Sequence, residues 1–326
     1  MKHVLFAALA LSCLAAVLFA GVPAADAQAQ TKKKPVPLWK KGIYAESVPE
    51  PTFKAVRYGE AKRNVLDFWQ APSKAPAPVV VFIHGGGWNG GDKAKLSDFV
   101  DTNVLLGAGV SVAAINYRLI KQCRDLDPPV MGPMTDAARA VQFIRSMAEA
   151  WNIDKARVGA VGPSAGACTS LWLAYHDDLA DPEADDPVAR ESTRLACVAA
   201  RRPQTSLDPK QMKAWIPNSK YGAHAFGLGS FDQFLAQRDR ILPHIQTYSP
   251  YGHLDAGDPP TYLSFPKAPL GPGEITRDPT HSVVFDVELA KQCQKLGVPC
   301  ELFYPGAPGV KHPTATEFLI TALTAE

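Results

Sequence analysis

The sequence predicts an α/β fold built on a parallel sheet. Two uninterrupted apolar runs, Pro78–His84 and Val110–Tyr117, are typical of strands buried on both faces, which occur inside parallel sheets. A helical stretch at Leu96–Leu106 separates them, and a third strand at Val158–Val161 precedes a helix that starts just after Ser164. Buried strands that alternate with helices are the pattern of α/β proteins.

The remaining segments continue this alternation on both sides. Edge strands are expected at Ala55–Tyr58 and Asn64–Trp69, and Thr135–Trp151 shows helical spacing of its apolar residues. The last third predicts a strand at Thr261–Phe265, a helix at His281–Leu296, a strand at Cys300–Tyr304 and a final helix from about Pro313.

The alternation breaks between Asp177 and Tyr251, where Asp, Pro and polar residues are frequent. One apolar run, Leu195–Ala200, fits a sheet strand, and helical pieces are expected around Pro209–Trp215 and Ser230–Arg240. An insertion above the active end of a sheet is usually a cap or lid. Residues 177–250 are therefore expected to include a cap insertion.

The first 27 residues have the features of a secretory signal peptide. A short basic start is followed by the apolar run Val4–Phe19, by Pro23, and by a small-x-small site at Ala25–Ala27. A transmembrane anchor is the alternative, but the run is short for a full span. We expect cleavage after Ala27, a secreted or periplasmic protein without stable membrane insertion, a leader at 28–54 and a catalytic domain at 55–326.

Composition and cysteine spacing exclude several other classes. A formal net charge of +2 over 326 residues gives no reason to expect a nucleic-acid partner. Loss of Cys13 would leave an odd number of cysteines, and no Cys/His spacing resembles a metal site. Cys293 and Cys300 bracket a helix end and the next strand, so they are candidates for a disulfide, with two free thiols as the alternative.

Ser164 occupies the centre of a Gly-x-Ser-x-Gly motif. Gly162 and Gly166 flank it two residues away on each side, between the strand and the helix. A serine held at the tip of such a turn forces close backbone contacts, which only small residues allow. The helix N-terminus also directs backbone N–H groups toward the serine oxygen. The motif and its context predict a nucleophile elbow.

A second motif, His84–Trp88, contains three consecutive glycines directly after a buried strand. Such a loop leaves backbone N–H groups exposed to a developing negative charge, as acyl transfer requires. Gly86 and Gly87, with the N–H of Ala165, are the candidate oxyanion hole. A flexible turn or a phosphate loop is the alternative, but the Lys-Ser/Thr ending and the dinucleotide spacing of phosphate loops are missing.

These motifs, together with Asn116–Arg118 and with Asp136 opening a helix, resemble the α/β-hydrolase esterases of the hormone-sensitive-lipase and feruloyl-esterase-like type. The resemblance covers roughly Ala55 to the C-terminus and is specific in the first half. It implies an eight-stranded sheet, Ser164 as nucleophile, the oxyanion donors named above, and a loop-shaping role for His84.

The order of the triad in this fold is serine, acid, histidine. His312 precedes the last helix and is the expected base, with His281 as its competitor at the start of the preceding helix. Asp278 is the expected acid by its offset from that helix, although an N-terminal carboxylate can instead stabilise the helix dipole. Glu274 is the second candidate for the acid.

The expected reaction is hydrolysis of a carboxylic ester through an acyl-enzyme, without a cofactor. The expected substrate is a small-molecule or glycan ester, such as an acetyl or feruloyl group on a polysaccharide, or a short-chain ester. A peptidase on the same fold and a non-catalytic binding protein are the alternatives.

Overall fold

The structure, a computed structural model, describes residues 42–269 and 275–325. The predicted signal peptide, most of the predicted leader and Glu274 lie outside the described residues. Within these ranges, eight strands form one sheet in the order β1-β2-β4-β3-β5-β6-β7-β8. The strands are β1 (Phe53–Arg57), β2 (Val65–Trp69), β3 (Ala77–Ile83), β4 (Ser111–Asn116), β5 (Ile153–Pro163), β6 (Cys197–Arg201), β7 (Thr261–Ser264) and β8 (Cys300–Phe303).

The sheet is mostly parallel, which confirms the predicted fold class. Only β2 runs against its neighbours: it pairs antiparallel with both β1 and β4. All pairings from β4 through β3 and β5 to β8 are parallel. The prediction that Asn64–Trp69 is an edge strand is wrong, because β2 is paired on both sides and all five of its residues are buried.

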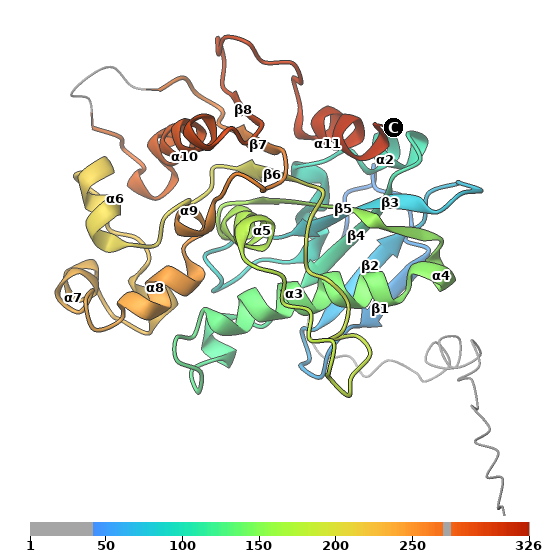
Figure 1. Cartoon of the computed structure of the whole chain (residues 1–326), viewed down its shortest axis with the longest axis horizontal. Helices are drawn as coiled ribbons and strands as arrows, with labels where there is room; N and C mark the ends of the chain where they lie inside the picture. Colours follow the sequence, from blue (N-terminus) through green and yellow to red (C-terminus); the bar gives the residue numbers. More distant parts are fainter. Residues whose placement is uncertain (1–41, 270–274, 326) are drawn as a thin grey trace, which may run out of the picture. The chain divides into compact units, whose positions relative to one another are not determined.

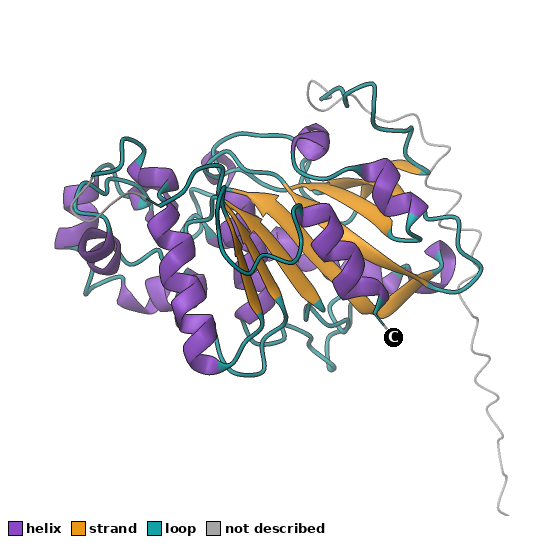
Figure 2. Cartoon of the chain, turned by 90° about the horizontal axis from the view of Figure 1, so that it is seen from above, coloured by secondary structure: helices purple, strands orange, loops and turns teal. Residues whose placement is uncertain are grey.

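Helices cover both faces of the sheet (Figure 2). Successive strand residues point to opposite faces, so each strand contributes to two separate cores. Val79 and Val81 of β3 join the core under α3 (Met131–Ser146), α5 (Ala165–Tyr175) and α10 (Val283–Leu296). Val80 and Phe82 join the core under α2 (Thr102–Gly107) and α11 (Ala315–Thr324).

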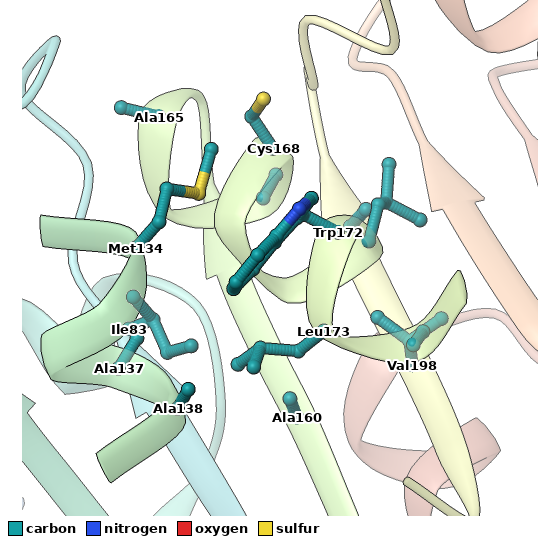
Figure 3. Close-up of a cluster of buried hydrophobic side chains, with 14 of the residues drawn as sticks. Ile83, Met134, Ala137, Ala138, Ala160, Ala165, Cys168, Trp172, Leu173 and Val198 are labelled. Carbon is teal, nitrogen blue, oxygen red and sulfur yellow. The ribbon is translucent and has the colours of Figure 1, made fainter. Parts of the chain in front are cut away.

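Helix α5 is the central helix of the first face, and all of its residues are buried. Its Trp172 and Leu173 belong to a buried cluster. The same cluster contains Ala160 and Val198 of the sheet and Ala138 of the neighbouring helix α3 (Figure 3). A helix that is apolar all round is stable only where it is enclosed. This enclosure holds the N-terminus of α5 rigidly against the carboxyl edge of the sheet.

The inserted region contributes one strand to the sheet and a helical group beyond it. Strand β6 begins inside the apolar run predicted at Leu195–Ala200 and ends one residue after it. The group between β6 and β7 gathers at one side of the sheet (Figure 1). Its members are α6 (Pro209–Trp215), η4 (Ala223–Phe226), α7 (Phe231–Ala236), α8 (Leu242–Tyr248) and α9 (Pro250–His253).

Helix boundaries follow local capping residues. Helix α10 begins at Val283 because the Ser282 side chain caps it by accepting from the N–H of Val284. It ends at Leu296 and is followed by the C-cap residue Gly297, which has φ 75°. His281, predicted to open this helix, instead ends the short 3-10 helix η5 (Pro279–His281). The remaining short elements are η2 (Lys93–Asp98), η3 (Ile120–Gln122) and α4 (Ala148–Trp151).

Cys293 and Cys300 are free in the structure, so the disulfide that we considered for this pair is not formed there. Among the described residues, no helix combines the length and apolarity that crossing a bilayer requires.

Candidate active site

Ser164 lies at a sharp turn between β5 and α5. Its backbone has φ 51° and ψ −122°, a conformation that costs a non-glycine residue free energy and is typical of functional sites. A Cβ atom on Gly162 or Gly166 would lie 2.4 Å or 2.0 Å from the carbonyl oxygen of Ile83. The two glycines therefore let the turn pack directly on β3, and the N–H of Ser164 bonds the carbonyl of Arg201 at 2.9 Å.

A histidine and an aspartate follow Ser164 in one hydrogen-bonded chain. The Oγ of Ser164 lies 2.9 Å from Nε2 of His281, and Nδ1 of His281 lies 2.9 Å from Oδ2 of Asp278. An ionised carboxylate can only accept, so Nδ1 carries the proton and Nε2 is left to accept from the serine hydroxyl. This tautomer is the one that can take the proton of Ser164.

The structure corrects the expectation that His312 contacts Ser164. Nδ1 of His312 lies 2.7 Å from Oε1 of Glu301, and its carbonyl accepts from the hydroxyl of Tyr262. His312 follows β8, an edge strand three positions from β5 in the sheet, whereas His281 follows β7, which is one strand closer. Each position adds about 4.8 Å, so the loop after β7 has the shorter distance to cover.

Asp278 accepts hydrogen bonds from His281 and from an arginine. Besides His281, the Nη2 of Arg202 donates to Oδ2 of Asp278 at 2.9 Å. Partial burial works to raise the pKa of this carboxyl, but the hydrogen bonds from His281 and the charge of Arg202 contribute to outweighing it and leave the pKa below its usual value. Asp278 also caps η5 by accepting from the N–H of His281, so the helix-cap role and the contact with the histidine coexist.

The glycine loop adjoins Ser164 at the point where the strand order reverses. The chain moves from β3 to β4 on one side and then crosses to β5 on the other, which is where open α/β sheets bind ligands. Gly86 has φ 113° and Gly87 has φ 60°, and Gly86 accepts from the N–H of Gly90 at 3.2 Å. Ala165 is the first residue of α5, so its N–H lacks a partner within the helix.

His84 shapes this loop from a buried position. Its ring stacks on Tyr117 with centroids 4.1 Å apart, and Nδ1 lies 2.8 Å from the carbonyl oxygen of Gly85. Nε2 lies 3.2 Å from a guanidinium nitrogen of Arg63, which can only donate. Burial lowers the pKa of His84 to about 4, so the imidazole is neutral and both of its nitrogens are occupied.

The inserted region supplies two side chains that the sequence did not single out. Nε2 of His224 lies 3.0 Å from the carbonyl oxygen of Gly87, and the rings of Tyr221 and His224 have centroids 6.5 Å and 6.3 Å from that of Trp88. No local motif marks these residues, which lie more than a hundred positions from the loop that they contact.

Arg202 also lacked a sequence signal, although its place directly after the strand next to β5 could have drawn attention to it. The described residues contain no group of three or more His, Cys, Asp and Glu side chains that could hold a metal ion.

The sheet topology, the strained serine between β5 and α5 and the adjoining glycine loop define an α/β-hydrolase. More specifically, the chain belongs to the BD-FAE family, whose model matches residues 66–265. This finding confirms the resemblance that the two motifs predicted.

Curated relatives match a shorter region. A probable isoprenylcysteine alpha-carbonyl methylesterase of Oryza sativa subsp. japonica is 32% identical over 120 residues, which are 35% of this chain and 26% of the relative. The esterase LipI of Mycobacterium tuberculosis is 29% identical over 103 residues, 32% of this chain and 30% of the relative. The chain thus matches less than a third of the length of either protein.

Solved structures match most of the chain at low identity and support the fold. An acetyl ester-xyloside bifunctional hydrolase from Caldicellulosiruptor lactoaceticus has a TM-score of 0.58 at 23% identity, covering 80% of this chain and 87% of its own. A thermophilic esterase from Thermogutta terrifontis has a TM-score of 0.59 at 22% identity, and the match covers 82% of this chain and 85% of the esterase.

Proposed function

We propose that this protein is a serine carboxylic-ester hydrolase that works through an acyl-enzyme. The observation that carries the proposal is the unbroken chain of hydrogen bonds from Ser164 through His281 to Asp278. Membership of the BD-FAE family and the esterase names among the relatives support the same reaction class.

His281 takes the hydroxyl proton of Ser164 as the serine oxygen attacks the ester carbonyl carbon. The carbonyl π electrons move to the carbonyl oxygen, which receives hydrogen bonds from the backbone N–H groups of Gly86, Gly87 and Ala165. The protonated His281 is stabilised by Asp278. It then gives its proton to the leaving oxygen as the carbonyl re-forms and the bond from the carbonyl carbon to that oxygen breaks, which releases the alcohol. The same residue next activates a water molecule, which hydrolyses the acyl-enzyme and releases the acid.

The proposed substrate is a small-molecule or glycan ester with a short acyl group. The support is the similarity in fold to two solved structures, those of an acetyl ester-xyloside bifunctional hydrolase and of a carbohydrate esterase from gut microbiota. Acetyl esters of a polysaccharide are the first substrates to test, with feruloyl esters and other short-chain esters beside them.

Two histidine variants test the mechanism against its rival. His281→Gln should lower kcat on p-nitrophenyl acetate by about 10⁴-fold or more, as Ser164→Ala should, because each removes a member of the proton-transfer chain. His312→Gln is the matched control and should leave kcat near that of the wild type. A collapse in His312→Gln with an active His281→Gln would move the base to His312. An inactive wild type would favour a binding protein without catalysis.

The proposed setting of this reaction is outside the cytoplasm. The basis is the signal-peptide pattern of residues 1–27. Expression of the full chain in a bacterial host, followed by mass spectrometry of the purified protein, should give a mature N-terminus at Gln28. A protein that is recovered from the cytosol with Met1 or Lys2 at its N-terminus would refute export.

A further inference from the structure

Tyr221 places a hydroxyl group beside the glycine loop. The residue lies between α6 and η4 in the helical group inserted after β6, far in sequence from the loop. Its Oη lies 3.6 Å from the point that a Cβ atom on Gly87 would occupy, next to Nε2 of His224 at 3.7 Å from the same point. The tyrosine hydroxyl is therefore in van der Waals range of the Gly87 position of the loop.

This hydroxyl is buried and has no hydrogen-bond partner among the described residues. A buried polar group without a partner costs roughly 1–3 kcal/mol, so native proteins rarely keep one that has no use. Burial raises the pKa of the Tyr221 phenol far above its usual value, so the group is neutral and keeps its proton. It is therefore a hydrogen-bond donor with its donor site unused.

The surrounding residues fix the direction of the Tyr221 ring. The ring of His224 meets it edge to face with centroids 5.0 Å apart, and His224 is itself anchored to the carbonyl of Gly87. Burial lowers the pKa of His224 more than this bond raises it, so the neutral imidazole donates through Nε2. Gly222, with φ 107°, lets the chain turn directly after Tyr221, since a Cβ there would lie 2.9 Å from Phe234.

We propose that the Tyr221 hydroxyl is a side-chain donor of the oxyanion hole, added to the backbone N–H groups of Gly86, Gly87 and Ala165. As the bond from Ser164 Oγ to the carbonyl carbon forms, the π electrons move to the carbonyl oxygen and the serine proton moves to His281. Tyr221 donates a hydrogen bond to that oxygen and keeps its own proton. The substrate thus supplies the acceptor that the free protein lacks.

This inference rests on the proposed esterase reaction and gives the inserted region a catalytic role. A donor that meets its partner only as charge develops stabilises the transition state more than the ground state. The buried ring of Trp88 lies beside that of Tyr221, and an apolar neighbour of this kind strengthens such a bond relative to water. The helical group after β6 is then part of the catalytic centre.

Tyr221→Phe tests the proposal, because it removes the hydroxyl and keeps the ring. We expect kcat on p-nitrophenyl acetate to fall about 100-fold with little change in KM, as for loss of one oxyanion-hole donor. Affinity for a boronic acid that forms a tetrahedral adduct on Ser164 should also fall. The melting temperature should stay the same or rise, since an unpaired buried hydroxyl is removed.

Tyr175→Phe is the matched control. The hydroxyl of Tyr175 is also buried, but it has a partner: it lies 2.8 Å from Oγ1 of Thr261. This pair is not part of the glycine loop. This variant should lose stability and keep kcat. If the wild type hydrolyses esters and Tyr221→Phe keeps the wild-type kcat, or changes only in KM, Tyr221 is not an oxyanion donor. A wild type that hydrolyses no ester would instead overturn the proposed function, and this inference with it.

Discussion

Replacement of Gly166 by alanine should be severely destabilising. The new Cβ atom would lie 2.0 Å from the carbonyl oxygen of Ile83 and 2.8 Å from backbone atoms of His84, whereas real Cβ contacts shorter than 3.0 Å essentially do not occur. Strand β3 and helix α5 would have to separate by about 1 Å, the difference between 3.0 Å and 2.0 Å. Both contacts are with backbone atoms at the carboxyl end of the central strand β3, so no side-chain rotation relieves them.

Overpacking of a core usually costs about 1–3 kcal/mol and more where the neighbours cannot move, so we expect at least about 3 kcal/mol for Gly166→Ala. Urea unfolding followed by tryptophan fluorescence measures this change. Gly107→Ala is the matched control: Gly107 ends α2, and a Cβ there meets nothing within 4 Å. It should be neutral or stabilising by up to about 1 kcal/mol. Equal stability of Gly166→Ala and the wild type would refute the close-approach argument for the motif.

Two carboxyl groups give further predictions. Asp278→Asn should lower kcat by about 10⁴-fold, because asparagine cannot hold His281 in the required tautomer. The stability of the folded protein should change little, since asparagine also caps well. Steady-state kinetics and thermal unfolding measure the two effects separately, and a wild-type kcat would exclude Asp278 as the acid. Asp286 is buried without a hydrogen-bond partner among the described residues, and burial raises its pKa in the folded protein well above the normal value. Between the pKa values of the unfolded and folded states, the folded state binds the extra proton, so the stability that Asp286 contributes declines as pH rises. Asp286→Asn should therefore gain stability over the wild type between pH 4 and pH 7 in thermal unfolding, and a constant difference across that range would contradict the assignment.

The sequence by itself was sufficient for the fold and for the two local motifs. Apolar runs without alternation predict strands buried on both faces, and the glycines around Ser164 predict a turn that packs closely on a neighbouring strand. Both signals are local, because they depend on side-chain size and on backbone freedom within a few residues. The structure accordingly has the predicted parallel sheet, and Gly162 and Gly166 are in contact distance of β3.

The tertiary structure decided which distant side chains meet. His281 and His312 both follow strands near the end of the chain, and sequence order favoured His312 because it precedes the last helix. The distance to Ser164 depends instead on the position of β7 and β8 in the sheet and on the turn that Asp278 caps. Tyr221 carries no local signal, because its contact with the glycine loop exists only once the inserted region packs against that loop.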